Sequence, residues 1–108
     1  MLFRSELASG EIPDSVEELL QTAEAEAVLE SVPVNYESGE PALSYLHSAL
    51  QQGMHAITAN KGPVVHGYRE LTQLAGENGK RFLFEATVLD GTPIFSTWRE
   101  CLPAARLK

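Results

Sequence analysis

The segment Thr58-Ala59-Asn60-Lys61-Gly62-Pro63 holds the side chains of this sequence that are best suited to chemistry. It follows a short apolar run, Met54–Ile57, and ends in a Gly-Pro pair, which predicts the C-terminal end of a strand. Open parallel sheets bind their ligands at that edge. A lysine fixed there, beside an amide and a hydroxyl, can donate a proton or hold an anion. Taken alone, however, the segment favours the alternative of a lysine on an exposed turn.

Helical and strand patterns alternate along the chain, which predicts an α/β fold with βαβ units and a parallel sheet. Ser15 and Glu18 form a capping box, so we expect a first helix from there to about Ala25. The other expected helices span about 41–52, 64–77 and 94–102, and the expected strands span 27–35, 54–59 and 81–88. Residues 1–13 are expected to form a lead-in loop. The whole pattern is that of half of a doubly wound domain.

The composition excludes several classes of function. A chain of 108 residues has room for one domain. The net charge of −7 argues against nucleic acid or an anionic membrane as the main partner, because both need clustered basic residues. No apolar run reaches membrane-spanning length, and the N-terminus lacks a signal-peptide core. The lone Cys101 precludes an internal disulfide, which fits a cytoplasmic location.

The predicted topology brings polar residues from distant parts of the chain together. The C-terminal ends of parallel strands share one edge of the sheet, so Ser31–Asn35, Thr58–Lys61 and Glu85–Pro93 are expected to be neighbours. Such an edge can bind a small polar substrate or part of a nucleotide cofactor.

Several motifs, in this order, make the chain resemble the homoserine dehydrogenases over about Ala27–Leu102. The matching segments are Glu30–Asn35, Gly39–Leu43, Thr58–Pro63, Tyr68–Leu71, Phe84–Val88, Gly91–Pro93 and Arg99–Glu100. The resemblance implies a three-layer, partial Rossmann-like NAD(P)-binding domain over residues 14–108, with about three mainly parallel strands flanked by helices.

The resemblance also implies an activity and the residues that serve it. Enzymes of the family interconvert L-homoserine and L-aspartate 4-semialdehyde with NAD or NADP, in the biosynthesis of threonine, methionine and isoleucine. Lys61 matches the lysine of their active site, and Ala59 and Asn60 match positions near the nicotinamide. Val32 stands where the family often has a cofactor-contacting Thr or Ser, which leaves at most a main-chain contact.

A cation site is implied in the same way. The positions of Glu85, Val88, Asp90 and Thr92 match residues whose main-chain carbonyls bind a monovalent cation, usually Na+. Oxygen ligands are those that hard cations prefer.

Parts of the complete enzyme are not represented in the sequence. It contains no G-x-G-x-x-G motif, and it stops before the family's substrate domain. We therefore expect the chain alone to be inactive. The alternative is a non-catalytic Rossmann-like module that serves interaction or oligomerisation. The strand at Val28–Val34 is expected to be an exposed edge, which favours self-association or a cap formed by Met1–Pro13.

Other reactive residues have simpler interpretations. The three histidines, His47, His55 and His66, are not at metal-ligand spacing, so we interpret them as ordinary surface or partly buried side chains. Cys101 is expected to be a small core residue, and Phe95 and Trp98 are expected to serve packing.

Overall fold

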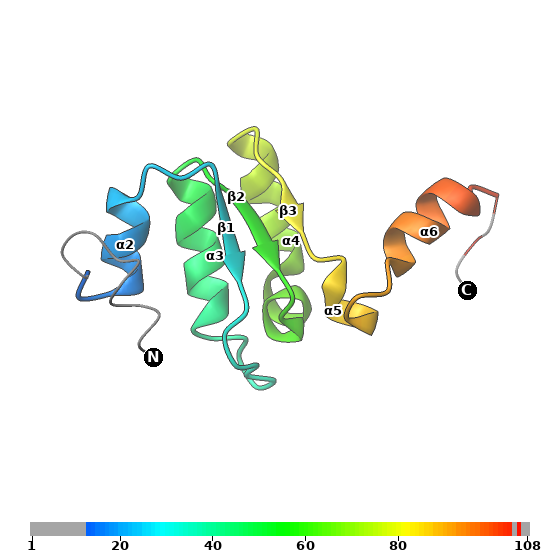
Figure 1. Cartoon of the computed structure of the whole chain (residues 1–108), viewed down its shortest axis with the longest axis horizontal. Coiled ribbons are helices and arrows are strands. Elements are labelled where there is room, and N and C mark those ends of the chain that lie inside the picture. The colour runs from blue at the N-terminus through cyan, green and yellow to red at the C-terminus, as the bar shows by residue number, and fades with distance from the viewer. Residues whose placement is uncertain (1–12, 105, 107–108) are drawn as a thin grey trace, which may run out of the picture.

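The computed structural model describes residues 13–104 and residue 106, and its centre is a parallel sheet of three strands in the order β1-β2-β3. The strands are β1 (Ala27–Glu30), β2 (His55–Thr58) and β3 (Phe82–Leu83). Their order and direction confirm the predicted small parallel sheet (Figure 1). The predicted lead-in loop lies outside the described residues except for Pro13.

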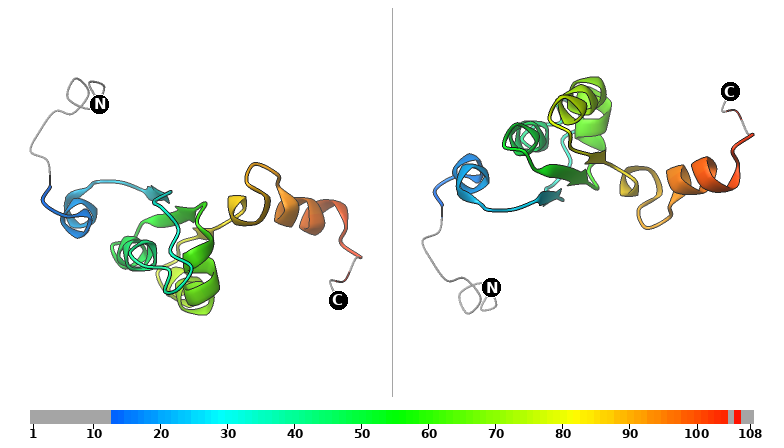
Figure 2. Two further views of the ribbon diagram at one scale, coloured as in Figure 1. Left: turned by 90° about the horizontal axis from the view of Figure 1, so that it is seen from below. Right: turned by 90° about the horizontal axis from the view of Figure 1, so that it is seen from above.

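Two long helices cover one face of this sheet. The described helices are α2 (Val16–Thr22), α3 (Ala42–Gln51), α4 (Lys61–Glu77), α5 (Ala86–Leu89) and α6 (Ile94–Cys101). Both views of Figure 2 place α3 and α4 on the same side of the strands. Their apolar faces meet the sheet in a core of fully or nearly fully buried residues, namely Leu46, Leu50, Ala56, Leu71 and Ala75. None of the described helices is long and apolar enough to cross a membrane.

The opposite face of the sheet carries a row of apolar side chains, which we call the open-face row. The strand register places Leu29 beside Ile57 and Ile57 beside Leu83. Leu29 is 73% exposed and Leu83 is 44% exposed. Successive strand side chains point to opposite faces, so this row points away from the buried core. The described residues thus supply two of the three layers of a doubly wound domain.

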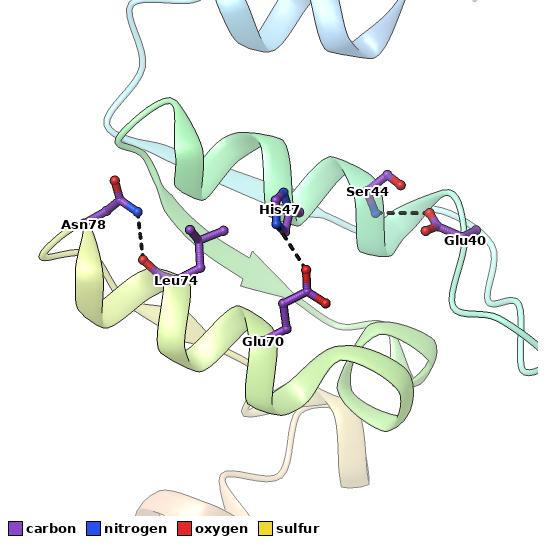
Figure 3. Close-up of polar contacts among 6 residues, drawn as sticks. All are labelled: Glu40, Ser44, His47, Glu70, Leu74 and Asn78. Carbon is purple, nitrogen blue, oxygen red and sulfur yellow. Dashed lines mark hydrogen bonds and ion pairs between the residues drawn. The ribbon is translucent and has the colours of Figure 1, made fainter.

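Polar contacts also join and end the two covering helices (Figure 3). His47 Nε2 of α3 lies 3.2 Å from Glu70 Oε1 of α4. The Glu40 carboxylate accepts a hydrogen bond from the Ser44 amide at 3.1 Å near the start of α3. Asn78 donates to the Leu74 carbonyl at 2.9 Å and satisfies part of the C-terminal end of α4. The pair on the surface contributes little stability, so the buried apolar contacts hold the two helices together.

The predicted capping box at the first helix forms only in part. The Ser15 hydroxyl accepts from the Glu18 amide at 3.1 Å, as expected of an N-cap. The Glu18 carboxylate, however, accepts from the amide of Asp14 at 2.9 Å. The helix ends at Thr22, three residues before the predicted end at Ala25.

Two predicted strands are shorter than their sequences indicate. The first was expected to run to Asn35 and the third to Val88, but they end at Glu30 and Leu83. The reason is β2, which pairs with both and ends at Thr58 because the chain then enters α4. Without a partner, the β-favouring residues after Leu83 form α5 instead.

The last helix, α6, lies apart from the core and has no buried residue. Its described attachments include Glu85, whose carboxylate accepts from the amide of Ser96 at 3.0 Å and from its hydroxyl at 3.2 Å. Phe95 packs its ring on Phe84 with 5.3 Å between centroids. Cys101 is exposed, so its prediction as a core residue is wrong. The apolar residues Phe95 and Trp98 of α6 line an open pocket together with Tyr68, Phe82 and Phe84, so this helix borders the core without being buried in it.

The loop between β1 and α3 rests directly on the first turn of α4. Gly39 has φ of +77°, and a Cβ on it would lie 2.9 Å from the Gly62 carbonyl oxygen. A Cβ on Gly62 would lie 2.8 Å from the Asn35 carbonyl oxygen and 3.0 Å from the Gly39 Cα. Both contacts are with backbone, which cannot rotate away. The two glycines therefore allow the loop and helix to touch.

We expect Gly62→Ala to lower the free energy of unfolding by about 1–3 kcal/mol, because the new methyl group overpacks against backbone. Gly76→Ala is the matched control on the same helix, since a Cβ there meets nothing within 4 Å. The control should raise stability by about 0.5–1 kcal/mol through helix propensity. Urea denaturation of both variants measures the difference, and equal effects would contradict the close contact.

Candidate functional site

A buried hydrogen-bond network joins the ends of β1 and β2. Glu30 is 4% exposed, and one of its carboxylate oxygens accepts from the Thr58 hydroxyl at 2.5 Å. The other accepts from the Val32 amide at 2.7 Å and from the Asn60 side-chain amide at 3.3 Å. The Thr58 hydroxyl in turn accepts from the Asn60 amide at 2.9 Å. A buried carboxylate is tolerated only with such partners, so this network fixes the geometry of the edge.

Asn60 carries the network into α4. Its side-chain oxygen accepts from the Gly62 amide at 3.1 Å, which makes it the N-cap of the helix. Lys61 is therefore the first helical residue, whereas the sequence predicted the end of a strand here and a helix only from about Val64. Pro63 fits the first turn because the amide that it lacks would have no partner inside the helix.

The electrostatics of this helix start favour an anion. The N-terminus of a helix carries a partial positive charge from its aligned peptide dipoles. Lys61 adds a full positive charge, and no acidic residue lies in the first turn of α4 to offset it. The lysine is exposed, and within residues 13–104 it has no ion-pair partner. An ammonium held here without a partner is available to a ligand.

The lysine stands at the edge of a pocket of about 230 Å³. The pocket lies between the segments that follow β1 and β2, and it is lined by Ser31, Val32, Val34, Tyr36, Ala59, Asn60 and Lys61. All of the residues predicted to bind cofactor, Val32, Ala59, Asn60 and Lys61, are in this set. The structure therefore brings together residues that lie about thirty positions apart in the sequence.

Hydrogen bonds within the protein limit which ligand contacts Asn60 and Val32 can make. Asn60 is 5% exposed, and its amide is bonded to Glu30, to the Val32 carbonyl at 3.2 Å and to Gly62. It positions the pocket wall and has little capacity left for a ligand. The amide and the carbonyl of Val32 are both hydrogen-bonded within the protein. Its isopropyl group is therefore the part that can contact a ligand in the pocket.

The residues predicted to bind a cation lie elsewhere. Glu85 precedes α5, Val88 lies within it, and Asp90 and Thr92 follow it. The chain turns after α5, where Asp90 has φ of +47° and the Thr92 amide donates to the Leu89 carbonyl at 2.8 Å. The Thr92 carbonyl accepts from the Ile94 amide at 2.8 Å. None of these residues lines the pocket at Lys61, so the third strand end does not join the other two there.

Within the described part of the chain, no group of three or more His, Cys, Asp or Glu side chains could hold a metal ion. Each histidine has a different partner. His47 faces Glu70, His55 Nδ1 accepts from the Arg81 amide at 3.0 Å, and His66 Nε2 lies 2.8 Å from the Tyr36 carbonyl oxygen.

Sequence reasoning missed three residues that shape this site, namely Glu30, Tyr36 and His66. Glu30 is the only acidic residue in the apolar run 27–34, which is a signal of a buried and partnered carboxylate. Tyr36 and His66 carry no local pattern that would mark them, because their contact joins a loop to a helix thirty residues away.

The fold and the site are those of a Rossmann-like nucleotide-binding domain. A parallel strand is followed by a two-residue connection and a capped helix, and the pocket lies beside that helix start. The sequence comparison agrees with this class and makes it specific. Residues 2–85 match the NAD-binding domain of homoserine dehydrogenase. The chain belongs to the homoserine dehydrogenase family.

Individual relatives show the same likeness. The NAD(+)-dependent homoserine dehydrogenase of Pseudomonas canavaninivorans is 31% identical over 95% of this chain and 29% of its own length. The structure of a homoserine dehydrogenase from Thiobacillus denitrificans superposes with a TM-score of 0.76 and 30% identity, over 98% of this chain and 24% of that one. The structure of a hyperthermophilic archaeal homoserine dehydrogenase in complex with NADPH superposes with a TM-score of 0.68 and 32% identity, over 86% of this chain and 28% of that one. The chain thus spans less than a third of the relatives that it matches.

We expect Glu30→Ala to lower the free energy of unfolding by about 2–4 kcal/mol, because it removes the acceptor of three hydrogen bonds whose donors are buried or part-buried. Glu30→Gln keeps one acceptor oxygen and should lose less. Glu24→Ala, an exposed glutamate in the segment before β1, is the control and should change stability by less than about 0.5 kcal/mol. Chemical denaturation followed by circular dichroism measures the free energy of unfolding of each variant. An unchanged value in Glu30→Ala would refute the network's structural role.

Proposed function

We propose that this chain provides the second half of the NAD(P)-binding domain of a homoserine dehydrogenase, which interconverts L-homoserine and L-aspartate 4-semialdehyde. The observation that carries the proposal is the pocket that Lys61 shares with Val32, Ala59 and Asn60, at the sheet edge where doubly wound folds bind ligands. The family membership supports the same reaction. A role in the biosynthesis of threonine, methionine and isoleucine, in the cytoplasm, follows from it.

The size of the pocket limits which part of a cofactor it holds. Pockets that enclose a whole drug-sized ligand typically measure about 300–1,000 Å³. The pocket at Lys61 measures about 230 Å³, so it fits one end of NAD or NADP and not the dinucleotide. Val32 and Ala59 would flank the nicotinamide, and Asn60 would set the distance between them through its bonds to Glu30 and Val32.

Lys61 performs the chemistry that the chain itself can supply. The bound nicotinamide cofactor supplies the hydride that converts the aldehyde carbon to an alcohol. The Lys61 ammonium donates a hydrogen bond to the aldehyde oxygen, stabilises the negative charge that develops on it, and gives it the proton that completes the hydroxyl. The helix N-terminus at Lys61 adds its partial positive charge to the same stabilisation.

We also propose that the main-chain carbonyls of Glu85, Val88, Asp90 and Thr92 bind a monovalent cation, which the family resemblance indicates to be Na+. The turn after α5 supports it, because all four carbonyls belong to one short stretch of chain that changes direction at Asp90, and oxygen ligands suit a hard cation. The Thr92 carbonyl would share its lone pairs between the cation and the Ile94 amide. Thermal unfolding in NaCl and in an equal concentration of tetramethylammonium chloride tests the site.

In a chimeric enzyme, with this chain in place of the matching segment of an active relative, Lys61→Ala should lower kcat by about 10²–10⁴-fold. Lys80→Ala is the matched control, because Lys80 lies beyond the far end of α4 and should leave kcat unchanged. Homoserine-dependent reduction of NAD(P) is the assay. Near wild-type turnover of the Lys61 variant would remove its catalytic role. The chain alone should show no turnover.

A second candidate function is that of an interaction or oligomerisation module. The observation in its favour is the open-face row, together with the position of β1 at an edge of the sheet. An apolar surface next to an unpaired strand edge favours association with another chain. Self-association of this chain is therefore part of the proposal, and it is compatible with the first function.

We expect the chain to sediment as a concentration-dependent mixture of monomer and dimer, and Leu29→Lys to shift that mixture to monomer. A lysine on an exposed edge strand opposes pairing because of its charge. Val65→Lys is the control, since Val65 is 75% exposed on α4, away from the sheet. Analytical ultracentrifugation of the three proteins is the measurement; a monodisperse monomeric wild type would eliminate self-association.

A further inference from the structure

Tyr36 has an unusual position for an aromatic residue. It lines the pocket at Lys61, and it is nevertheless 69% exposed. The ring has no aromatic partner among the described residues, whereas Tyr68, Phe82, Phe84 and Phe95 contact one another. An exposed ring beside a pocket commonly serves a ligand, because it offers a flat apolar face with a polar tip.

The backbone that carries this ring is held in place from several directions. The Asn35 side-chain oxygen accepts from the Glu37 amide at 3.0 Å and from the Ser38 amide at 3.2 Å, which closes a tight turn over Tyr36. The Gly39 amide donates to the Asn35 carbonyl at 2.9 Å. The same carbonyl oxygen would touch any side chain placed on Gly62, so the turn is seated against α4.

His66 completes this support from the side of α4. Its Nε2 lies 2.8 Å from the Tyr36 carbonyl oxygen. A carbonyl oxygen only accepts hydrogen bonds, so Nε2 carries the proton and donates it. The main chain of Tyr36 is thus fixed on both sides while its ring remains exposed. A ring on a fixed backbone loses only two side-chain torsions on binding, so it contributes affinity with little entropic penalty.

We propose that Tyr36 is a ring-stacking contact for the nicotinamide end of the cofactor, and that His66 is the residue that positions it. The inference rests on the proposed function, because it assigns a further contact to the same pocket. Tyr36 would cover the nicotinamide ring on the side of the pocket mouth, and Lys61 would remain free for the aldehyde. The pocket would then recognise a planar ring by stacking as well as by the shape of its walls.

The test is a titration of the ¹⁵N-labelled chain with nicotinamide mononucleotide, followed by NMR because the method detects millimolar affinities. Tyr36→Ala should raise the Kd about tenfold, the usual effect of losing an aromatic stack, and Tyr36→Phe should keep it within about twofold. His66→Leu should raise the Kd about threefold, whereas His66→Gln, which retains a donor near Nε2, should restore it. The unfolding midpoints of all four variants should match that of the wild type, because these side chains are exposed.

Each outcome separates this inference from the function on which it rests. Wild-type affinity in Tyr36→Ala, with weakened binding in Lys61→Ala, would overturn the stacking role and leave the proposed function standing. An equal loss in His66→Leu and His66→Gln would overturn the positioning role. If Tyr36→Ala weakens AMP and spares nicotinamide mononucleotide, the nicotinamide assignment is wrong. If the wild-type chain binds neither probe, the proposed function fails and this inference with it.

Discussion

The buried carboxylate of Glu30 is the constraint on which the rest of the site depends. A carboxylate in an apolar interior is unfavourable unless hydrogen bonds replace the water that it loses. Here the replacements come from the main chain after β1, from β2 and from the helix cap, so satisfying one group fixes three segments at once. The position of the pocket and the start of α4 follow from that single requirement. The network therefore fixes the geometry of the site, just as the buried apolar core around Leu46 and Leu71 fixes the packing of the helices on the sheet.

Much of the fold follows from the sequence because its cues are local. Apolar periodicity, Ser15 as a cap and the breaks at Gly53 and Asn78 are each visible within a few residues, and the parallel sheet follows from their alternation. The ends of β1 and β3 do not follow, because they depend on where β2 turns into α4. Lys61 was predicted at a strand end and occupies one, but as the first residue of a helix, since the cap that places it is bonded to Glu30, thirty residues away. The prediction for Cys101 failed for a similar reason: the pattern of α6 indicates an apolar face but not whether a core lies opposite it.

The molecule is strongly asymmetric across its sheet. One face is closed by α3 and α4 with tightly packed small and branched residues, and the other presents the open-face row. The pocket lies at the end of the strands between these two faces, where the loop after β1 meets the start of α4. The chain spans 29% of the Pseudomonas canavaninivorans relative and 24% of the Thiobacillus denitrificans one.

The connection between β2 and α4 consists of Ala59 and Asn60 alone, and the side chain and amide of Asn60 are bonded on both sides. A connection this short and this fully bonded cannot swing as a gate. The lysine backbone is already in its final place before a ligand arrives, so little of the binding energy is spent on ordering it. Association at this edge should accordingly be a single kinetic step whose rate rises linearly with ligand concentration, without the plateau that a slow loop closure imposes.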